Sequence, residues 1–255
     1  MKNSSFEKLK NPPIKETVIG IGINNYFSGD LKNTPLYNEL VKIYPKTIPT
    51  YNTDISIVDG KIQNTNNDIC GYCFQSEEGK ESTFVAYNRI AFVDRNRYES
   101  FDIFFNKFKK IFNLIQESKP IKKCTQIALK HVNQIFLEQS ELSTPIPKIK
   151  FLPNFNTKTK TNTTAQWFAQ LSRFSGSYII QSVKNTQIKS FIDTSLQFVG
   201  NPPRLQVLFI IDTVVDVNND LNALSNLEDY MSQLRDFKNT IFFENVERDI
   251  KEFSK

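Results

Sequence analysis

The chain has 255 residues, with one histidine, eight glycines, three cysteines and 22 phenylalanines. Histidine is the usual proton-transfer side chain near neutral pH, and glycine-rich turns bring a backbone close to phosphate, so their scarcity disfavours acid–base catalysis and nucleotide binding. The net charge of +5 is mildly basic and neither requires nor excludes a nucleic-acid partner. An odd number of cysteines argues against a disulfide framework.

The chain has no apolar run near the roughly 20 residues that a membrane span requires. Its first sixteen residues are polar and charged, unlike a signal peptide. We therefore expect a cytoplasmic protein without a membrane partner.

The first half of the chain predicts mainly strands. Residues 14–23 alternate as a strand does, and its Gly20 and Gly22 indicate a bend or a close neighbour rather than a dinucleotide loop. The other predicted elements are a short helix at 36–44, a loop at 45–68 around one strand at 54–58, and a β-hairpin with arms at 69–76 and 82–94.

Residues 98–115 carry the clearest helical pattern. Apolar residues recur there at steps of three and four and form one stripe, namely Tyr98, Phe101, Phe104, Phe105, Phe108, Ile111, Phe112 and Ile115. Such a stripe predicts a helix packed on the core, and not a ligand site.

The second half predicts a strand at 124–137 with a bulge near His131, a helical turn at 165–171, and helices near the C-terminus. Further strands are expected at 177–184, 189–199 and 204–217. Ser225 to Glu228 forms a capping box before a helix, and Phe242 begins a last amphipathic helix.

These elements predict an α+β protein with two mixed or antiparallel sheets and amphipathic helices packed on them. We expect an N-terminal lobe at 1–142, a Pro-rich and polar loop at 143–164, and a C-terminal lobe at 165–255 that ends in helices. The order strand-strand-helix recurs in both halves, at 84–115 and at 205–237, which favours a duplicated ferredoxin-like unit.

Cys70 and Cys73 form a C-x-x-C pair on a predicted hairpin arm. Residues three apart in a strand point to opposite faces, so we interpret both as structural cysteines and not as a redox pair. No second ligand pair follows at the spacing of a zinc site.

Asp216, Asn218 and Asp220 resemble the first ligands of a calcium loop. The positions that require glycine and glutamate are Leu221 and Leu227, so this stretch is interpreted as a strand end and turn. A metal-dependent enzyme built on Asp212 and Asp216 is the weakest hypothesis. His131 has no orienting acid or nucleophile beside it in the sequence.

Lysines interleaved with aromatic residues are the strongest remaining hint of a binding surface. The candidates for contact with a nucleic acid or a partner are Lys148, Lys150, Phe151, Phe155, Lys158, Lys160 and Trp167. The competing interpretation is that these lysines only solvate a loop, because acids are interspersed nearby.

Several segments resemble a sporadically distributed bacterial protein family of similar length that has no established activity. They are Asn11–Ile14 with Glu16; Arg89 and Phe92 before Tyr98 and Phe101; Ala128–Ile135; and Leu234–Asn239 followed by Phe242. Gln126-Ile127-Ala128 stands where that family shows an arginine-glycine lead. The scattered distribution of the family implies an accessory role in phage defence or beside a toxic effector.

We therefore expect a non-catalytic interaction or regulatory protein with no cofactor, no metal and no catalytic residue. Its edge strands and the loop at 143–164 would bind a protein encoded nearby, as an accessory or immunity component of a phage-defence or toxin–antitoxin system. The alternative is an RNA- or DNA-binding module built from ferredoxin-like sheets.

Overall fold

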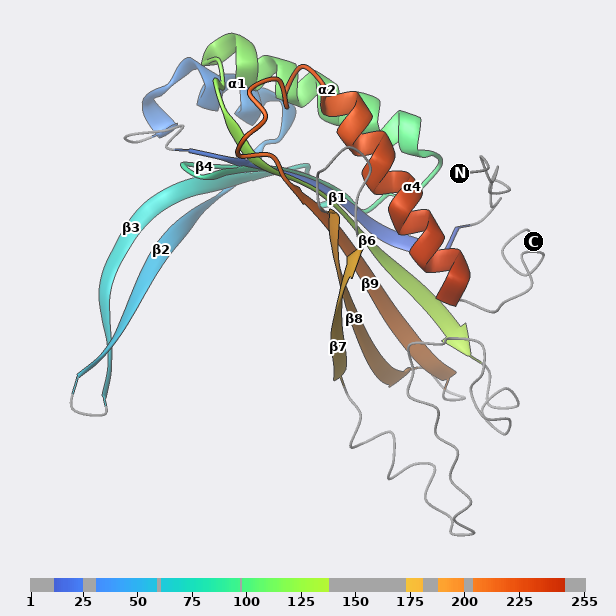
Figure 1. Ribbon diagram of the computed structural model, residues 1–255. Coiled ribbons are helices and arrows are strands. Elements are labelled where there is room, and N and C mark those ends of the chain that lie inside the picture. Colours follow the sequence, from blue (N-terminus) through green and yellow to red (C-terminus); the bar gives the residue numbers. More distant parts are fainter. Residues whose placement is uncertain are drawn as a thin grey trace, which may run out of the picture. The chain divides into compact units, whose positions relative to one another are not determined.

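The computed structural model describes residues 12–24, 31–58, 61–96, 98–137, 173–180, 188–199 and 204–245 (Figure 1). They form a mixed α+β protein, as predicted. Its elements are β1 (Ile14–Ile23), the 3-10 helix η1 (Leu31–Asn33), α1 (Pro35–Ile43), β2 (Lys46–Val58), β3 (Lys61–Gln75), β4 (Glu81–Ala86), β5 (Arg89–Asp94), α2 (Phe101–Ser118), β6 (Cys124–Leu137), β7 (Arg173–Ile180), β8 (Ile188–Val199), β9 (Arg204–Asp216) and α4 (Leu227–Asn245).

The strands belong to one nine-stranded sheet in the order β2-β3-β4-β5-β1-β6-β9-β8-β7. The pairings β2–β3, β3–β4, β4–β5, β7–β8 and β8–β9 are all antiparallel. The prediction of two sheets is not confirmed, because β1 and β6 are neighbours within this one sheet of described strands. A duplicated ferredoxin-like unit is not confirmed by the described elements.

Contacts divide the chain into two compact units. The α1–α2 unit comprises residues 18–128 and 216–227, and the α4 unit comprises residues 1–17, 129–215 and 228–255. Strands β1 and β6 contribute residues to both. The loop predicted at 143–164 lies outside the described residues, so the division into lobes at that loop stays a prediction.

Helix α2 carries the aromatic stripe into the core of the α1–α2 unit, as its spacing predicts. The Ser100 side chain caps the helix by accepting a hydrogen bond from the backbone N–H of Ile103 at 3.3 Å. Phe104 and Phe108 lie against the Phe92 ring of β5. Seven side chains of the helix are buried, namely Phe101, Phe104, Phe105, Phe108, Ile111, Phe112 and Ile115.

The prediction for residues 45–68 was wrong: β2 and β3 form a long hairpin there instead of a loop around one strand. This stretch is rich in asparagine and threonine and lacks a regular apolar alternation, which is the signal used to predict strands. The predicted hairpin arm at 82–94 is also two strands, β4 and β5, separated by Tyr87 and Asn88.

The predicted strands at 14–23 and 124–137 are confirmed, and β7, β8 and β9 occupy the later strand regions with shifted ends. Helix α4 runs without a break from Leu227 through Phe242, so no boundary separates the two predicted helices, and the last predicted helix beyond Asn245 lies outside the described residues. No proline or glycine interrupts residues 235–241, so nothing in the chain ends the first predicted helix there. None of the described helices is long and apolar enough to cross a membrane.

Close strand packing explains Gly71 of the α1–α2 unit but not Gly20. A Cβ atom on Gly71 of β3 would overlap the Val85 carbonyl oxygen and lie 2.7 Å from the Ala86 Cα of β4. A Cβ on Gly20 of β1 would lie at an ordinary 3.7 Å from the Ala128 Cβ. Both glycines are in strands, but only Gly71 is required by its backbone neighbours.

We therefore predict that Gly71→Ala lowers the free energy of unfolding by about 1–3 kcal/mol, the usual cost of overpacking. Gly20→Ala is the matched control and should change it by less than about 1 kcal/mol. Urea denaturation monitored by circular dichroism measures both values. Equal losses in the two variants would contradict the close approach of β3 and β4.

Candidate functional site

The seven residues predicted to contact a partner lie outside the described part of the chain. Lys148, Lys150, Phe151, Phe155, Lys158, Lys160 and Trp167 all fall between positions 138 and 172, so the structure does not test them. Of the basic residues on α2, Lys107 is bound to two carboxylates and the Lys109 Nζ lies 5.2 Å from the centre of the Phe105 ring. These two lysines therefore have intramolecular contacts.

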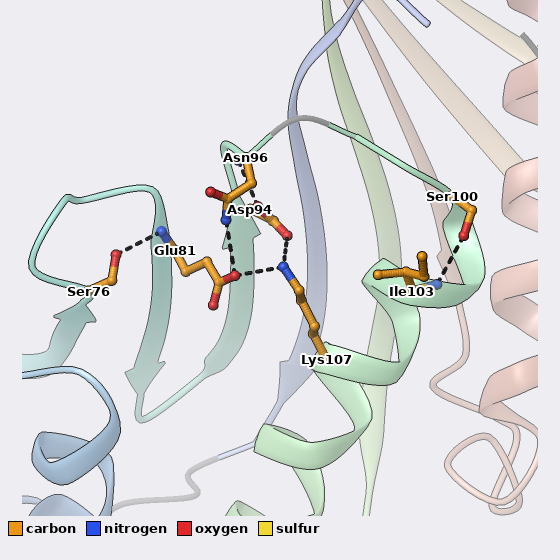
Figure 2. Close-up of polar contacts among 7 residues, drawn as sticks. All are labelled: Ser76, Glu81, Asp94, Asn96, Ser100, Ile103 and Lys107. Carbon is orange, nitrogen blue, oxygen red and sulfur yellow. Dashed lines mark hydrogen bonds and ion pairs between the residues drawn. The ribbon is translucent and has the colours of Figure 1, made fainter. Parts of the chain in front are cut away.

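The first polar cluster joins helix α2 to the β4–β5 hairpin (Figure 2). The Lys107 Nζ lies 2.7 Å from the Glu81 Oε1 and 3.0 Å from the Asp94 Oδ2. Asn96 donates from its side chain to the Glu81 Oε1 at 3.0 Å and from its backbone to the Asp94 Oδ1 at 2.8 Å. The Lys107 ammonium group, the Asn96 side-chain amide and the Asn96 backbone N–H thus bind the two carboxylates.

Electrostatics in this cluster favour a structural role. Burial lowers the pKa of Lys107, but its hydrogen bonds to Glu81 and Asp94 raise that pKa more, so its net shift is upward. Burial and the nearby charge of Glu81 raise the pKa of Tyr44 to about 12, although an interaction with Thr83 partly offsets the rise. The lysine is charged and the phenol neutral at pH 7, and neither is prepared to exchange a proton.

Removing the central cation should destabilise the α1–α2 unit. Lys107→Met leaves Glu81 and Asp94 without their ammonium partner, and we expect a loss of about 1–2 kcal/mol in the free energy of unfolding. Lys110→Met, at an exposed position of the same helix, should cost less than about 0.5 kcal/mol. Urea titrations of both variants test the difference, and a cost no larger for Lys107→Met would be inconsistent with a stabilising cluster.

The second polar cluster lies beneath α4, where His131 of β6 meets Lys238. The Lys238 Nζ lies 2.5 Å from the Nδ1 and 3.1 Å from the Nε2 of the imidazole. The two side chains are only 1% and 4% exposed, respectively. Lys238 has no ion pair to a carboxylate among the described residues.

Burial is the main cause that holds both pKa values well below their usual ranges. For His131 the charge of Lys238 adds to this effect, and for Lys238 the charge of Arg235 does. A neutral amine beside an imidazole is chemically reactive in principle. Here the pair is closed off by α4, so a substrate has no access to it, and we interpret it as a buried polar contact of the core.

The sequence pattern singles out His131 but not Lys238 as a candidate functional residue. The available signal was positional, because Lys238 continues the buried stripe of α4 that includes Met231, Leu234 and Ile241. A lysine at an apolar position of a helix indicates a buried partner, which a search for acids and nucleophiles beside His131 does not reveal.

Replacing this lysine by an apolar residue should stabilise the protein. Lys238→Met removes a buried amine that has no carboxylate partner among the described residues, and we expect a gain of about 1–3 kcal/mol in the free energy of unfolding at pH 7. The exposed Lys189→Met is the control. Urea denaturation at pH 7 gives the comparison.

The pH dependence has a defined sign. Because folding depresses the pKa of Lys238, the unfolded chain binds more protons, and wild-type stability should rise from pH 7 to pH 9 by at most about 1.4 kcal/mol per pH unit from this group. Lys238→Met should lose that rise, whereas Lys189→Met should keep it. An unchanged slope in Lys238→Met would show that the amine is charged in the folded protein.

The three cysteines are free thiols. The Cys70 Sγ lies 3.7 Å from the Thr50 Oγ1, and Cys73 is contacted by the side chain of Gln75. Cys124 is buried, which raises its thiol pKa to about 11. Among the described residues no group of three or more histidines, cysteines and acids is placed to hold a metal ion.

The acidic stretch after β9 forms turns, as predicted. The Asp216 Oδ1 accepts hydrogen bonds from the backbone and side chain of Asn218 at 3.1 and 2.9 Å, and the Asp220 Oδ1 accepts one from the backbone of Asn222 at 2.8 Å. These are the local contacts of aspartates that shape turns. They account for this acidic sequence without a cation.

The α4 unit leaves one face of its strands without a described helix. Phe209 of β9 contacts Phe242 of α4, and His131 contacts Lys238, so the odd-numbered residues of β6 and β9 lie under the helix. The opposite surface, which we call the helix-free face, consists of Val132 and Phe136 of β6, Phe191 of β8, and Ile210 and Val214 of β9 with their charged neighbours. Phe191 is 49% exposed and Phe136 is 38% exposed.

The charges on the helix-free face are mixed. Among the residues whose side chains the structure describes, the charged ones on this face are Lys130, Lys189, Asp193, Asp212 and Asp216. Two lysines among three aspartates do not form the basic stripe expected of a surface that binds phosphate. Apolar side chains in a mixed polar surround are typical of a protein-binding surface.

A scan against models of protein families and a search of curated proteins found no match for this chain.

Proposed function

We propose that this protein is a non-catalytic binding protein that recognises another protein through the helix-free face of its α4 unit. The observation that carries the proposal is Phe191, a large aromatic side chain half exposed on a strand opposite α4. It lies in register with Asp212 of β9, and two positions further along β8 Asp193 lies in register with Ile210. An aromatic anchor with polar neighbours is the composition that protein interfaces favour.

The polar clusters support the same proposal. Lys107 neutralises its two carboxylates, and the His131–Lys238 pair lies beneath α4 out of reach of a substrate. The described side chains thus use their charged groups to hold elements together. What they present to solvent on the helix-free face is apolar surface with a few mixed charges.

The biological setting in this proposal comes from the family resemblance of the sequence. We propose that the protein acts beside a protein encoded nearby, as an accessory or immunity component of a phage-defence or toxin–antitoxin system. The RNA- or DNA-binding alternative depends on the lysines between positions 148 and 160, and no described basic surface favours it.

The test is binding of the purified full-length chain to the product of the neighbouring gene, measured by isothermal titration calorimetry. Phe191→Ser should weaken binding at least about tenfold, since truncating a central aromatic residue commonly costs more than 1.4 kcal/mol. Leu221→Ser is the matched control, because Leu221 is an exposed apolar residue of a turn that is not part of the helix-free face, and it should bind as the wild type does.

Full affinity in Phe191→Ser would overturn the proposed surface. A filter-binding assay with a DNA duplex and a transfer RNA over a salt series tests the alternative. Tight binding that weakens steeply with salt would replace protein binding by nucleic-acid binding. Weak binding with little dependence on salt is the result we expect.

A further inference from the structure

The hairpin of β2 and β3 extends well beyond its neighbour in the sheet (Figure 1). The two strands pair from Lys46 with Gln75 to Val58 with Lys61, whereas β4 pairs only with residues 71–75 of β3. Residues 51–58 and 61–69 therefore form a ribbon without a third strand among the described elements. We call this ribbon the arm. A two-stranded ribbon is marginally stable in water by itself, so such an arm is expected to gain stability from a partner.

Strand β2 is the last strand of the sheet, and its outer edge is unpaired among the described strands. Natural edges are commonly protected by proline, lysine or bulges. Lys46 and Pro49 protect the base of β2, but its sequence from Tyr51 to Val58 contains neither residue type. At each of the two register shifts of the hairpin, β3 has one extra residue without a partner on β2. The bulges are therefore in β3, and the pairing of β2 is continuous.

The hydrogen bonds show which residues of β2 face this free edge. The Cys70 carbonyl accepts from the Tyr87 N–H, and the Ser76 N–H donates to the Glu81 carbonyl, so the even-numbered residues at the base of β3 face β4. The odd-numbered residues of β3 direct their backbone groups toward β2, where they form hydrogen bonds with even-numbered residues such as Thr50. The odd-numbered residues of β2 therefore direct their backbone groups outward, and Pro49, which has no N–H, occupies one of these positions.

We propose that a second copy of this chain pairs antiparallel with β2, centred on Thr53, so that two arms form a four-stranded sheet. In this register each residue from Ile48 to Val58 lies opposite one of similar polarity. The cross-strand pairs are Thr53 with Thr53, Asn52 with Asp54, Tyr51 with Ile55, Thr50 with Ser56, Pro49 with Ile57, and Ile48 with Val58. Aromatic–β-branched and Thr–Ser pairs are among the stabilising cross-strand combinations, at about 0.2–1 kcal/mol each.

Registers centred one residue away from Thr53 have less favourable cross-strand pairs. Centring the pair on Asp54 places the two aspartates opposite each other, and like charges in that position are destabilising. Centring it on Asn52 places Ile48 opposite Ser56 and Thr50 opposite Asp54, which loses the matched pairs. Asp54 therefore favours the register centred on Thr53.

The negative charge of the arm argues against nucleic acid as its partner. Residues 51–68 contain Asp54, Asp59 and Asp68 but only Lys61, a net charge of −2 from three acids and one base. Ribbons that enter nucleic acid require positive charge, because phosphate contacts supply most of the affinity. The exposed Tyr51 and Ile69, which are in register, give the arm apolar surface suited to protein contact.

The contact is small, so the dimer should depend on concentration. Five outward residues per chain supply about eight backbone hydrogen bonds, because each Pro49 lacks a donor. An interface below about 1,000 Å² is typical of weak association, and we expect a dissociation constant in the micromolar range. The proposed dimer contact includes no residue of the helix-free face, so Phe191→Ser should dimerise as the wild type does.

The experiment is sedimentation velocity of the full-length chain from about 1 to about 200 µM, a range that brackets micromolar dissociation constants. The wild type should shift from monomer to dimer. Thr53→Pro removes an outward N–H without touching the β2–β3 hydrogen bonds and should stay monomeric. Thr53→Val keeps that donor and should dimerise.

A second variant tests the same edge in case Thr53→Pro does not fold. Tyr51→Lys introduces an edge-protecting lysine at an exposed position and should raise the dissociation constant at least about tenfold. A wild type that stays monomeric, or a dimer unaffected by both variants, would overturn the inference. So would a monomer whose binding to the neighbouring gene product is lost in Thr53→Pro, because the edge would then receive a strand of another protein.

Discussion

The structure depends on one constraint: the described helices bury one face of the strands they pack on. In the α4 unit the odd-numbered residues 129–135 of β6 and 207–215 of β9 are buried, and Phe209 contacts Phe242 of the helix. Side chains of a strand alternate between faces, so the same pattern leaves the even-numbered residues on the other side. Both the core and the proposed binding surface follow from this alternation.

The same constraint determines where polar chemistry lies. His131 lies on the buried face of β6, and Lys238 of α4 packs on it. Burying these polar side chains lowers the stability of the fold, although less than it would if both were charged, because burial lowers both pKa values. Lys107 instead lies where α2 borders the β4–β5 hairpin, and it stays charged because Glu81 and Asp94 bind it. One cluster therefore costs stability and the other contributes to it. Neither presents a reactive group to a ligand.

The sequence revealed the elements whose burial is periodic. The stripe from Phe101 to Ile115 and the alternation of 14–23 each reflect one covered face, so the helix and the strand were predictable. The arm has polar residues in most positions, and its backbone pairing leaves no such pattern. Only residues 54–58 of β2 and the end of β3 from residue 69 were therefore predicted as strands. The order of strands was also hidden, because β6 pairs with β1 more than a hundred positions away. Lys238 could be recognised only from its place among apolar neighbours on α4.

The most direct test of the account is hydroxyl-radical footprinting of the isolated full-length chain, with side-chain oxidation measured by mass spectrometry. Because Phe191 is half exposed, it should be oxidised rapidly, whereas the buried Phe209, Phe92 and Phe108 should be oxidised slowly. Protection of Phe191 to the level of Phe209 would show that the helix-free face is already covered within the chain, and would contradict the central claim.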